Sequence, residues 1–215
     1  MLSCTSDKFF LLIQHPYKSR FVVSEHIKDA GMTGAVLLDL VRHGNIEIIN
    51  GHLIAKSMVT DLPPVHRMVL SKIYSAPKPR KIRKWILWFA RHHRKMQEVI
   101  LYGLQDKGLI TVVKKNFLGF GYLRGRLADN GARESLISDI HACILSDTEL
   151  EGEQSLILAL INVCKIHKII CSNKKERKAC KKKLEVIMKS DLICRALRKA
   201  IDEIHIALIG AITVS

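Results

Sequence analysis

The stretch that decides the fold runs from residue 30 to residue 54 and reads AGMTGAVLLDLVRHGNIEIINGHLI. Its first half holds a dense group of apolar residues: Ala35, Val36, Leu37, Leu38, Leu40 and Val41. A helix that is apolar on nearly all sides is buried. Gly44 stands where such a helix ends in a left-handed residue, and Asn50-Gly51 is a type I′ turn signal. The stretch therefore predicts a buried central helix that leads through a glycine into a tight β-hairpin.

The same spacing occurs a second time along the chain. Residues 37–46 and residues 101–110 both fit the pattern L-x-x-L-x-x-x-G-x-I. The second copy leads into a hairpin over residues 109–127, for which we expect the turn at Lys115-Asn116. Because repeat arrays need three or more units, we interpret both copies as a common helix–glycine–strand junction.

The composition indicates a helical protein with anionic partners. Apolar residues make up 48% of the 215 residues, enough for a core, while aromatic residues are only 6%. This balance favours cores packed by Leu, Ile and Ala. It favours a mainly helical fold over a β-sandwich, and the length fits one large domain or two small ones. The net charge of +15 favours nucleic acid or an anionic membrane surface as partner.

Several patterns argue against other classes of protein. Six scattered cysteines without a C-x-x-C pair, behind an N-terminus that lacks a signal-peptide layout, indicate reduced thiols in a cytoplasmic protein. No apolar run approaches the roughly 20 residues of a membrane span, so any membrane contact should be peripheral. Cys164, His167 and Cys171 share one face of an expected helix, but no partner pair completes a zinc site. We therefore predict no metal or other cofactor, and we predict that the protein is not an enzyme.

The longest expected helix covers residues 80–107 and is strongly basic in its first half. No acidic residue lies between Lys78 and Gln97. Another helix is expected to have its cap at Thr60-Asp61, to start at Pro63-Pro64 and to end near Tyr74. Further helices are predicted over residues 7–14, 132–145, 153–170, 174–189 and 192–213.

The end of the second hairpin mixes apolar and basic side chains. Phe117, Leu118 and Phe120 lie among the cations Lys114, Lys115, Arg124 and Arg126. Insertion at a membrane interface uses this combination, because apolar groups enter the acyl boundary while cations meet the head groups. The alternative interpretation is that alternate residues of the hairpin pack on the core.

In the order of its segments the chain resembles the Golgi phosphoprotein 3 family, the peripheral phosphoinositide-binding proteins of the Golgi and their bacterial relatives. The matching segments are FFLLI at 9–13, AGMTGAVLLDLVRHGNIEI at 30–48, LQDKGLI at 104–110, KKNFLGF at 114–120 and LRKAIDEIHIALIGAI at 197–212. The resemblance implies a mainly α fold: a single domain over residues 1–215, with a hydrophobic helical core surrounded by amphipathic helices and one or two short β-hairpins. It also implies a basic face that binds phosphatidylinositol 4-phosphate and a hydrophobic hairpin that enters the membrane. Eukaryotic members also bridge glycosyltransferase tails to coat proteins.

The chain departs from the family at its lipid pocket. The family uses a tryptophan and an arginine that flank the start of the central helix, and these positions fall near Ser24 and on Thr33. Of two further arginines, three residues apart in the long helix, Arg94 matches one and Gln97 replaces the other. Arg91 and Arg94 keep the spacing one turn earlier. The resemblance therefore supports the fold more strongly than the identity of the lipid.

These observations lead to one main hypothesis and three alternatives. We expect a peripheral protein that binds anionic membrane lipid. The expected head-group contacts are Arg91, Arg94, Lys95 and Lys84, and the expected membrane-contacting hairpin residues are Phe117, Leu118 and Phe120. A winged-helix-like nucleic-acid-binding protein is less favoured, because the central helix is too apolar for a recognition helix. A further alternative is a scaffold that binds protein tails. The hairpin could also pair with a second copy of the chain to form a homo-oligomer.

Overall fold

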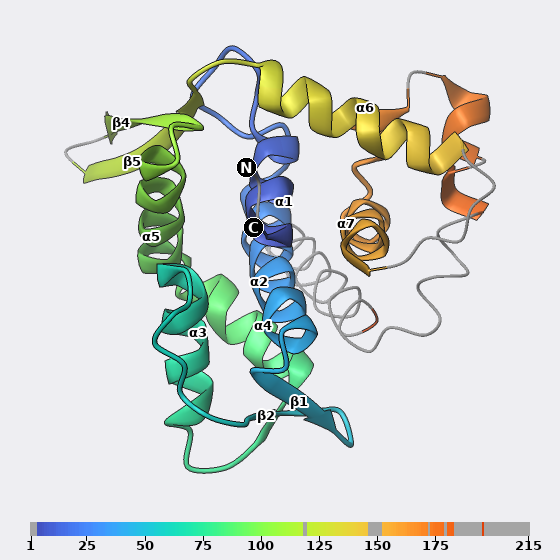
Figure 1. The fold of residues 1–215 in the computed structure, drawn as a ribbon. Helices are drawn as coiled ribbons and strands as arrows, with labels where there is room; N and C mark the ends of the chain where they lie inside the picture. Colours follow the sequence, from blue (N-terminus) through green and yellow to red (C-terminus); the bar gives the residue numbers. More distant parts are fainter. Residues whose placement is uncertain are drawn as a thin grey trace, which may run out of the picture.

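The computed structural model describes residues 4–117, 120–145, 152–171, 173–178, 180–182 and 195. The helices are α1 (Thr5–Ile13), α2 (Glu25–Arg42), α3 (Pro64–Tyr74), α4 (Ile82–Arg91), α5 (His93–Asp106), α6 (Gly131–Leu145), α7 (Gly152–Val163) and α8 (His167–Ile170). The strands are β1 (Ile46–Ile49), β2 (His52–Ala55), β3 (Arg80–Lys81), β4 (Ile110–Phe117) and β5 (Phe120–Leu127). The predicted mainly α fold is confirmed (Figure 1).

Helix α2 is the centre of the core. Every residue from Lys28 to Leu40 is buried, and the helix packs against α1, α3, α4 and α7. Gly44 follows the end of α2 and has a φ of +71°, as its position in the sequence predicts. Asn50 and Gly51 both have positive φ and join the antiparallel strands β1 and β2. The helix and hairpin predicted for residues 30–54 are therefore confirmed.

The contact between α1 and α2 depends on the absence of a side chain at Gly31. A Cβ atom there would lie 2.4 Å from Cζ of Phe9 and 3.0 Å from Sγ of Cys164, and both of those residues are buried. Neither neighbour is the free end of an exposed side chain. The two helices approach as closely as they do because residue 31 is glycine.

Gly31→Ala is therefore expected to lower the free energy of unfolding by about 2 kcal/mol, the usual size of an overpacking penalty. Urea unfolding followed by circular dichroism measures the change. Gly103→Ala in α5 is the matched control, because nothing lies within 4 Å of its added Cβ. There the substitution should be neutral or slightly stabilising. Equal effects at the two glycines would contradict the close-approach argument.

The single long helix predicted for residues 80–107 is wrong. The chain forms the short strand β3, then α4, then α5, and the two helices meet at His92. The backbone of His92 leaves the helical region, with φ of −102° and ψ of +31°. Its ring stacks on Trp88 at a centroid distance of 4.1 Å, and its Nδ1 lies 2.7 Å from the Trp88 carbonyl oxygen. These local contacts occupy the last turn of α4 and support the change of direction.

Two other helix predictions also need correction. Helix α3 begins directly at Pro64 after Pro63, so the expected cap at Thr60-Asp61 is not used. The helix predicted for residues 153–170 is broken between Val163 and His167, where Lys165 has a positive φ of 56°. Because of this break, Cys164 and His167 do not share one helical face. Of the two terminal helices predicted, residues 174–178 and 180–182 are helical, and most of the remaining positions lie outside the described residues.

The second hairpin lies within the predicted residues 109–127, but its turn comes later in the chain than predicted. Lys115 pairs with Tyr122 and Asn116 pairs with Gly121, so the ladder continues to Phe117 and Phe120. The turn expected at Lys115-Asn116 is therefore wrong. Continuing the ladder past these two residues adds backbone hydrogen bonds and pairs Phe117 with Phe120. At its base the hairpin packs on the core: a Cβ on Gly125 would lie 3.0 Å from both Leu101 and Ile110. None of the helices that the structure describes is both long and apolar enough to span a bilayer.

Candidate functional site

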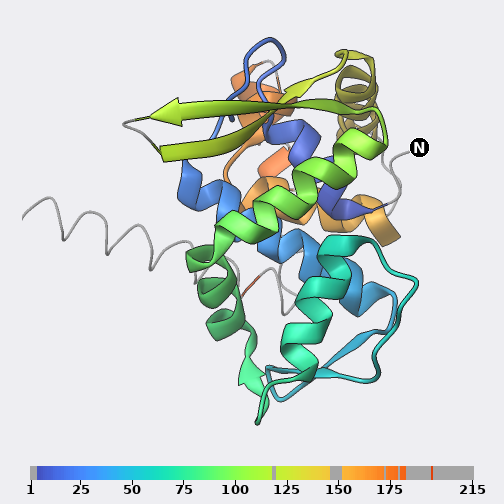
Figure 2. The same ribbon diagram turned by 90° about the vertical axis from the view of Figure 1, so that its left-hand side faces the viewer.

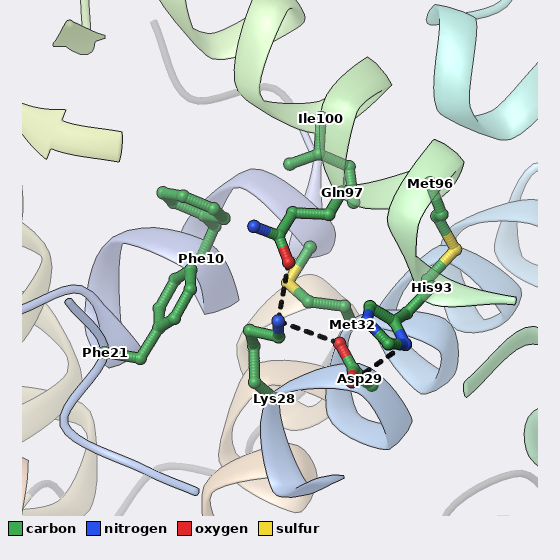
Figure 3. Close-up of a pocket in the computed structure, with 9 residues that line it drawn as sticks. All are labelled: Phe10, Phe21, Lys28, Asp29, Met32, His93, Met96, Gln97 and Ile100. Carbon is green, nitrogen blue, oxygen red and sulfur yellow. Dashed lines mark hydrogen bonds and ion pairs between the residues drawn. The ribbon is translucent and has the colours of Figure 1, made fainter. Parts of the chain in front are cut away.

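A small pocket lies where the start of α2 meets α5, close to the base of the β4–β5 hairpin (Figure 3). Its lining residues are Phe10, Phe21, Lys28, Asp29, Met32, His93, Met96, Gln97 and Ile100. The internal space is about 10 Å³, roughly enough for one water molecule. The pocket occupies the region in which the family resemblance implies a lipid head group, so its contents decide whether such a ligand fits.

The polar centre of the pocket is Lys28, which is only 2% exposed. Its Nζ donates to Oε2 of Glu25 and Oε1 of Gln97, both at 2.6 Å, and forms an ion pair with Oδ1 of Asp29 at 3.0 Å. The ammonium also lies 5.1 Å from the centre of the Phe21 ring. A lysine has three N–H donors, and these three acceptors satisfy all of them. The positive charge of Lys28 is thus already compensated inside the protein.

Gln97 connects the pocket to the hairpin. Its Oε1 accepts the hydrogen bond from Lys28, and its Nε2 donates to the carbonyl oxygen of Leu123 in β5 at 3.0 Å. This neutral side chain stands where the family resemblance places an arginine. An arginine could not accept from Lys28, because a guanidinium has donors only. Gln97 therefore links α2 to β5 at the position where the family resemblance implies an arginine of the lipid pocket.

The acidic side chains beside Lys28 have shifted pKa values. Burial raises the pKa of Asp29 above its ordinary value, although Lys28 and His93 oppose the shift. Burial also acts to raise the pKa of Glu25, but hydrogen bonds from Arg124 and Lys28 outweigh it and hold that pKa below its ordinary value. Arg124 Nη2 lies 2.8 Å from Glu25 Oε1, with its guanidinium over the rings of Tyr122 and Phe21. Two carboxylates thus balance two cations.

The lowered pKa of Glu25 gives a pH-dependent prediction. Because its pKa is lower in the folded state than in the unfolded state, its stabilising contribution is present at neutral pH and is lost as the pH falls through the lowered pKa of the folded state. Glu25→Gln should cost less than about 1 kcal/mol at pH 7, since the carboxylate is half exposed. The difference from wild type should disappear in acid. Urea unfolding of the variant and the wild-type protein, at pH 7 and in acid, measures this difference. Glu98→Gln on the surface of α5 is the control.

Ser24 and Thr33, which replace the family's tryptophan and arginine, bring no ligand group into the pocket. Ser24 is exposed and precedes the first residue of α2. Thr33 is fully buried and donates its hydroxyl hydrogen bond to the Asp29 carbonyl oxygen at 2.8 Å. The pocket is therefore closed and internally neutralised, with no space for a phosphate group.

The predicted head-group residues lie outside this pocket, on the surface. Arg91 ends α4, and Arg94 and Lys95 are in the first turn of α5, so the structure brings these three together at the helix junction. Lys84 lies in the first turn of α4, about 10 Å from Arg91 along the helix axis. All four are exposed, and none forms an ion pair with any residue that the structure describes.

Lys84 belongs to a different basic surface. It borders a shallow hollow lined by His52, Lys78, Pro79, Arg80, Lys81 and Lys84. Figure 2 shows the α4–α5 junction and the far end of the hairpin on the same side of the molecule, whereas β3 and the start of α4 lie lower in the view. Phe117 and Phe120 form the last pair of the ladder. Leu118 and the side chains of both phenylalanines lie outside the described part of the chain.

Lys28 and Glu25 were not singled out by the sequence, and Arg124 was named only as one of the cations of the hairpin. The available signal was the spacing of Glu25 and Lys28, which places an ion pair one turn apart at the start of α2. Their partners Gln97 and Arg124 are far away in sequence. The pattern along one segment could not reveal that these side chains meet.

The elements described so far define a class of protein: a helical domain built on one buried helix, with a β-hairpin and an exposed basic helix junction. A comparison with protein families finds that the model for Golgi phosphoprotein 3 (GPP34) matches residues 6–204. The match spans most of the chain, which therefore belongs to the Golgi phosphoprotein 3 (GPP34) family. A comparison with curated proteins finds no match.

Proposed function

We propose that this protein binds anionic phospholipid head groups as a peripheral membrane protein. Arg91, Arg94 and Lys95 make the main contacts, and Lys84 contributes from its neighbouring surface. The observation that carries the proposal is the position of three exposed cations without ion-pair partners among the described residues, on the side of the molecule where the hairpin ends (Figure 2). The chain acts through binding and not through catalysis.

Charge and apolar insertion must act together. Each cation close to an anionic membrane surface contributes about 1 kcal/mol, so three or four give only weak attachment. Phe117, Leu118 and Phe120 add apolar insertion at about 25 cal/mol for each Å² buried. Stable membrane attachment commonly requires two such signals. The hairpin therefore supplies the second signal that the basic junction needs.

The closed pocket indicates how selective this binding is. Glu25, Asp29 and Gln97 already accept the three N–H donors of Lys28. A head group therefore meets the exposed junction and not an enclosed site. An exposed set of cations responds mainly to surface charge density. Phosphatidylinositol 4-phosphate and other anionic lipids should therefore bind similarly when vesicles carry the same charge.

Sedimentation with lipid vesicles tests the proposal. The wild-type protein should sediment with vesicles that contain anionic lipid and remain in the supernatant with neutral vesicles. Phe117→Asp should reduce sedimentation on the anionic vesicles, because it places a charge in the inserting hairpin. Binding that is independent of anionic lipid content, or that Phe117→Asp leaves unchanged, would refute the proposal.

The nucleic-acid alternative receives no support from the central helix. A recognition helix must expose side chains to a groove, whereas α2 is buried from Lys28 to Leu40. A DNA-binding measurement over a range of salt concentrations still separates the two functions. Tight DNA binding with a steep salt dependence, together with no vesicle binding, would favour the alternative.

A further inference from the structure

Three potential metal ligands from separate segments meet in the core, away from the proposed lipid surface. Cys4 precedes α1, Asp39 lies in α2 and His66 lies in α3. Their ligand atoms all lie within 4.8 Å of one another, and all three residues are at least nine-tenths buried. The closest approach is between His66 Nε2 and Asp39 Oδ2, at 3.0 Å.

The chemistry of this group fits one kind of ion. A thiolate, an imidazole and a carboxylate together are a donor set that Zn²⁺ accepts, whereas Mg²⁺ and Ca²⁺ prefer oxygen ligands alone. Bond lengths of 2.0–2.3 Å in a tetrahedral zinc site place neighbouring ligand atoms about 3.3–3.7 Å apart. His66 Nε2 and Asp39 Oδ2, at 3.0 Å, are slightly closer than this and have to separate by a few tenths of an ångström. Because all the ligand atoms lie within 4.8 Å of one another, movements of about 1 Å bring Cys4 into the range.

Surrounding groups hold the ligands in place. Asp39 Oδ1 accepts from the backbone N–H of Thr5 at 2.9 Å, and Oδ2 accepts from that of Ser6 at 3.1 Å. Ser6 Oγ lies 3.2 Å from Cys4 Sγ. Such supporting hydrogen bonds orient the ligands of metal sites and are part of how these sites are built.

One polar atom of the group lacks a partner. His66 Nδ1 is buried and makes no hydrogen bond within the described residues. A buried polar atom without a partner commonly indicates a water molecule or an ion. Three protein ligands also leave the fourth position of a tetrahedral ion for water.

We propose that Cys4, Asp39 and His66 form a buried Zn²⁺ site that joins α1, α2 and α3. When the ion binds, the Cys4 S–H bond breaks, its proton passes to solvent, and a zinc–sulfur bond forms. Neutral His66 binds through Nε2 after its proton moves to Nδ1, and Asp39 binds as the carboxylate. The site is structural, because it lies in the core and connects three helices, and it is independent of the proposed lipid-binding function.

Cobalt(II) is the probe, because a cobalt–thiolate bond gives a charge-transfer absorption band. Since the site is buried, the full-length chain is unfolded, stripped of metal with a chelator, and refolded with Co²⁺. The expected result is one Co²⁺ per chain with a thiolate band. Cys4→Ser should abolish the band, and Cys143→Ser, a thiol outside the group, should keep it.

A second measurement covers the case in which Cys4→Ser folds poorly. Refolding with Zn²⁺ should move the urea midpoint of the wild-type protein to higher concentration, and His66→Gln should remove this shift. Folded wild-type protein without a cobalt–thiolate band, or a band that persists in Cys4→Ser, would overturn the proposal. In that case Asp39 and His66 serve only as a buried hydrogen-bonded pair.

Discussion

Replacing Arg91, Arg94 and Lys95 together by alanine is expected to weaken binding to anionic vesicles by about 100-fold. Each cation near the surface contributes about 1 kcal/mol, so three contribute about 3 kcal/mol. All three side chains are exposed and without ion-pair partners among the described residues, so their removal should not alter stability by more than about 0.5 kcal/mol. Vesicle titration at low salt measures the loss. Higher salt should reduce the difference in vesicle affinity between the wild-type protein and the triple variant, because salt screens exposed charges.

The matched control removes the same charge elsewhere. Lys174, Lys175 and Lys178 are exposed in the helical segment that follows α8. In Figure 1 this segment (orange) lies at the right, and the hairpin lies at the left. The triple alanine variant of these lysines should retain most of the vesicle affinity. If both triple variants lose affinity equally, binding depends on total charge, and the assignment to the α4–α5 junction is wrong.

Replacing Lys28 by methionine should destabilise the protein by about 3 kcal/mol, although methionine is apolar and similar in length. The substitution leaves the buried Asp29 carboxylate without its closest cation, and removal of one partner from a buried ion pair typically costs 3–5 kcal/mol. It also leaves Oε1 of Gln97 without a donor. Urea unfolding at neutral pH measures the change.

Two further variants show whether the loss comes from the buried charge. Lys56→Met removes an exposed lysine whose ion pair with Glu47 is 4.0 Å long, so it should cost less than about 0.5 kcal/mol. Lys28→Met combined with Asp29→Asn should recover part of the stability, because no unpaired charge then remains in the pocket. A double variant that is less stable than Lys28→Met alone would contradict this account.

The central part of the fold was predictable because its signals are local. Gly44, Gly51 and Gly108 all adopt the positive φ that their places in the sequence indicated. The helix break at His92 was missed, although the apolar spacing is interrupted there by residues 91–95, RHHRK, because a polar stretch of this kind also occurs on the exposed face of a continuous helix. The contacts of His92 with Trp88 depend on the exact turn at which the helix ends.

The candidate site was only partly predictable, since its key contacts join distant segments. The sequence showed that Ser24, Thr33 and Gln97 depart from the residues that the family resemblance implies, but not which side chains fill the pocket. Lys28 and Gln97 are 69 positions apart, and Gln97 and Leu123 are 26 apart. Cys4, Asp39 and His66 carry no motif spacing at all. Such groups become visible only when the packing of the helices is known.

The dependence of α1 on distant partners also fixes when this helix can form during synthesis. A nine-residue helix is too short to be stable alone in water. The first backbone N–H groups of α1 are satisfied by Asp39, and its apolar face packs against α2, α6 and α7. The last of these ends at Val163. Helix α1 therefore gains its full stability only after the chain has been translated past Val163, more than a hundred residues later.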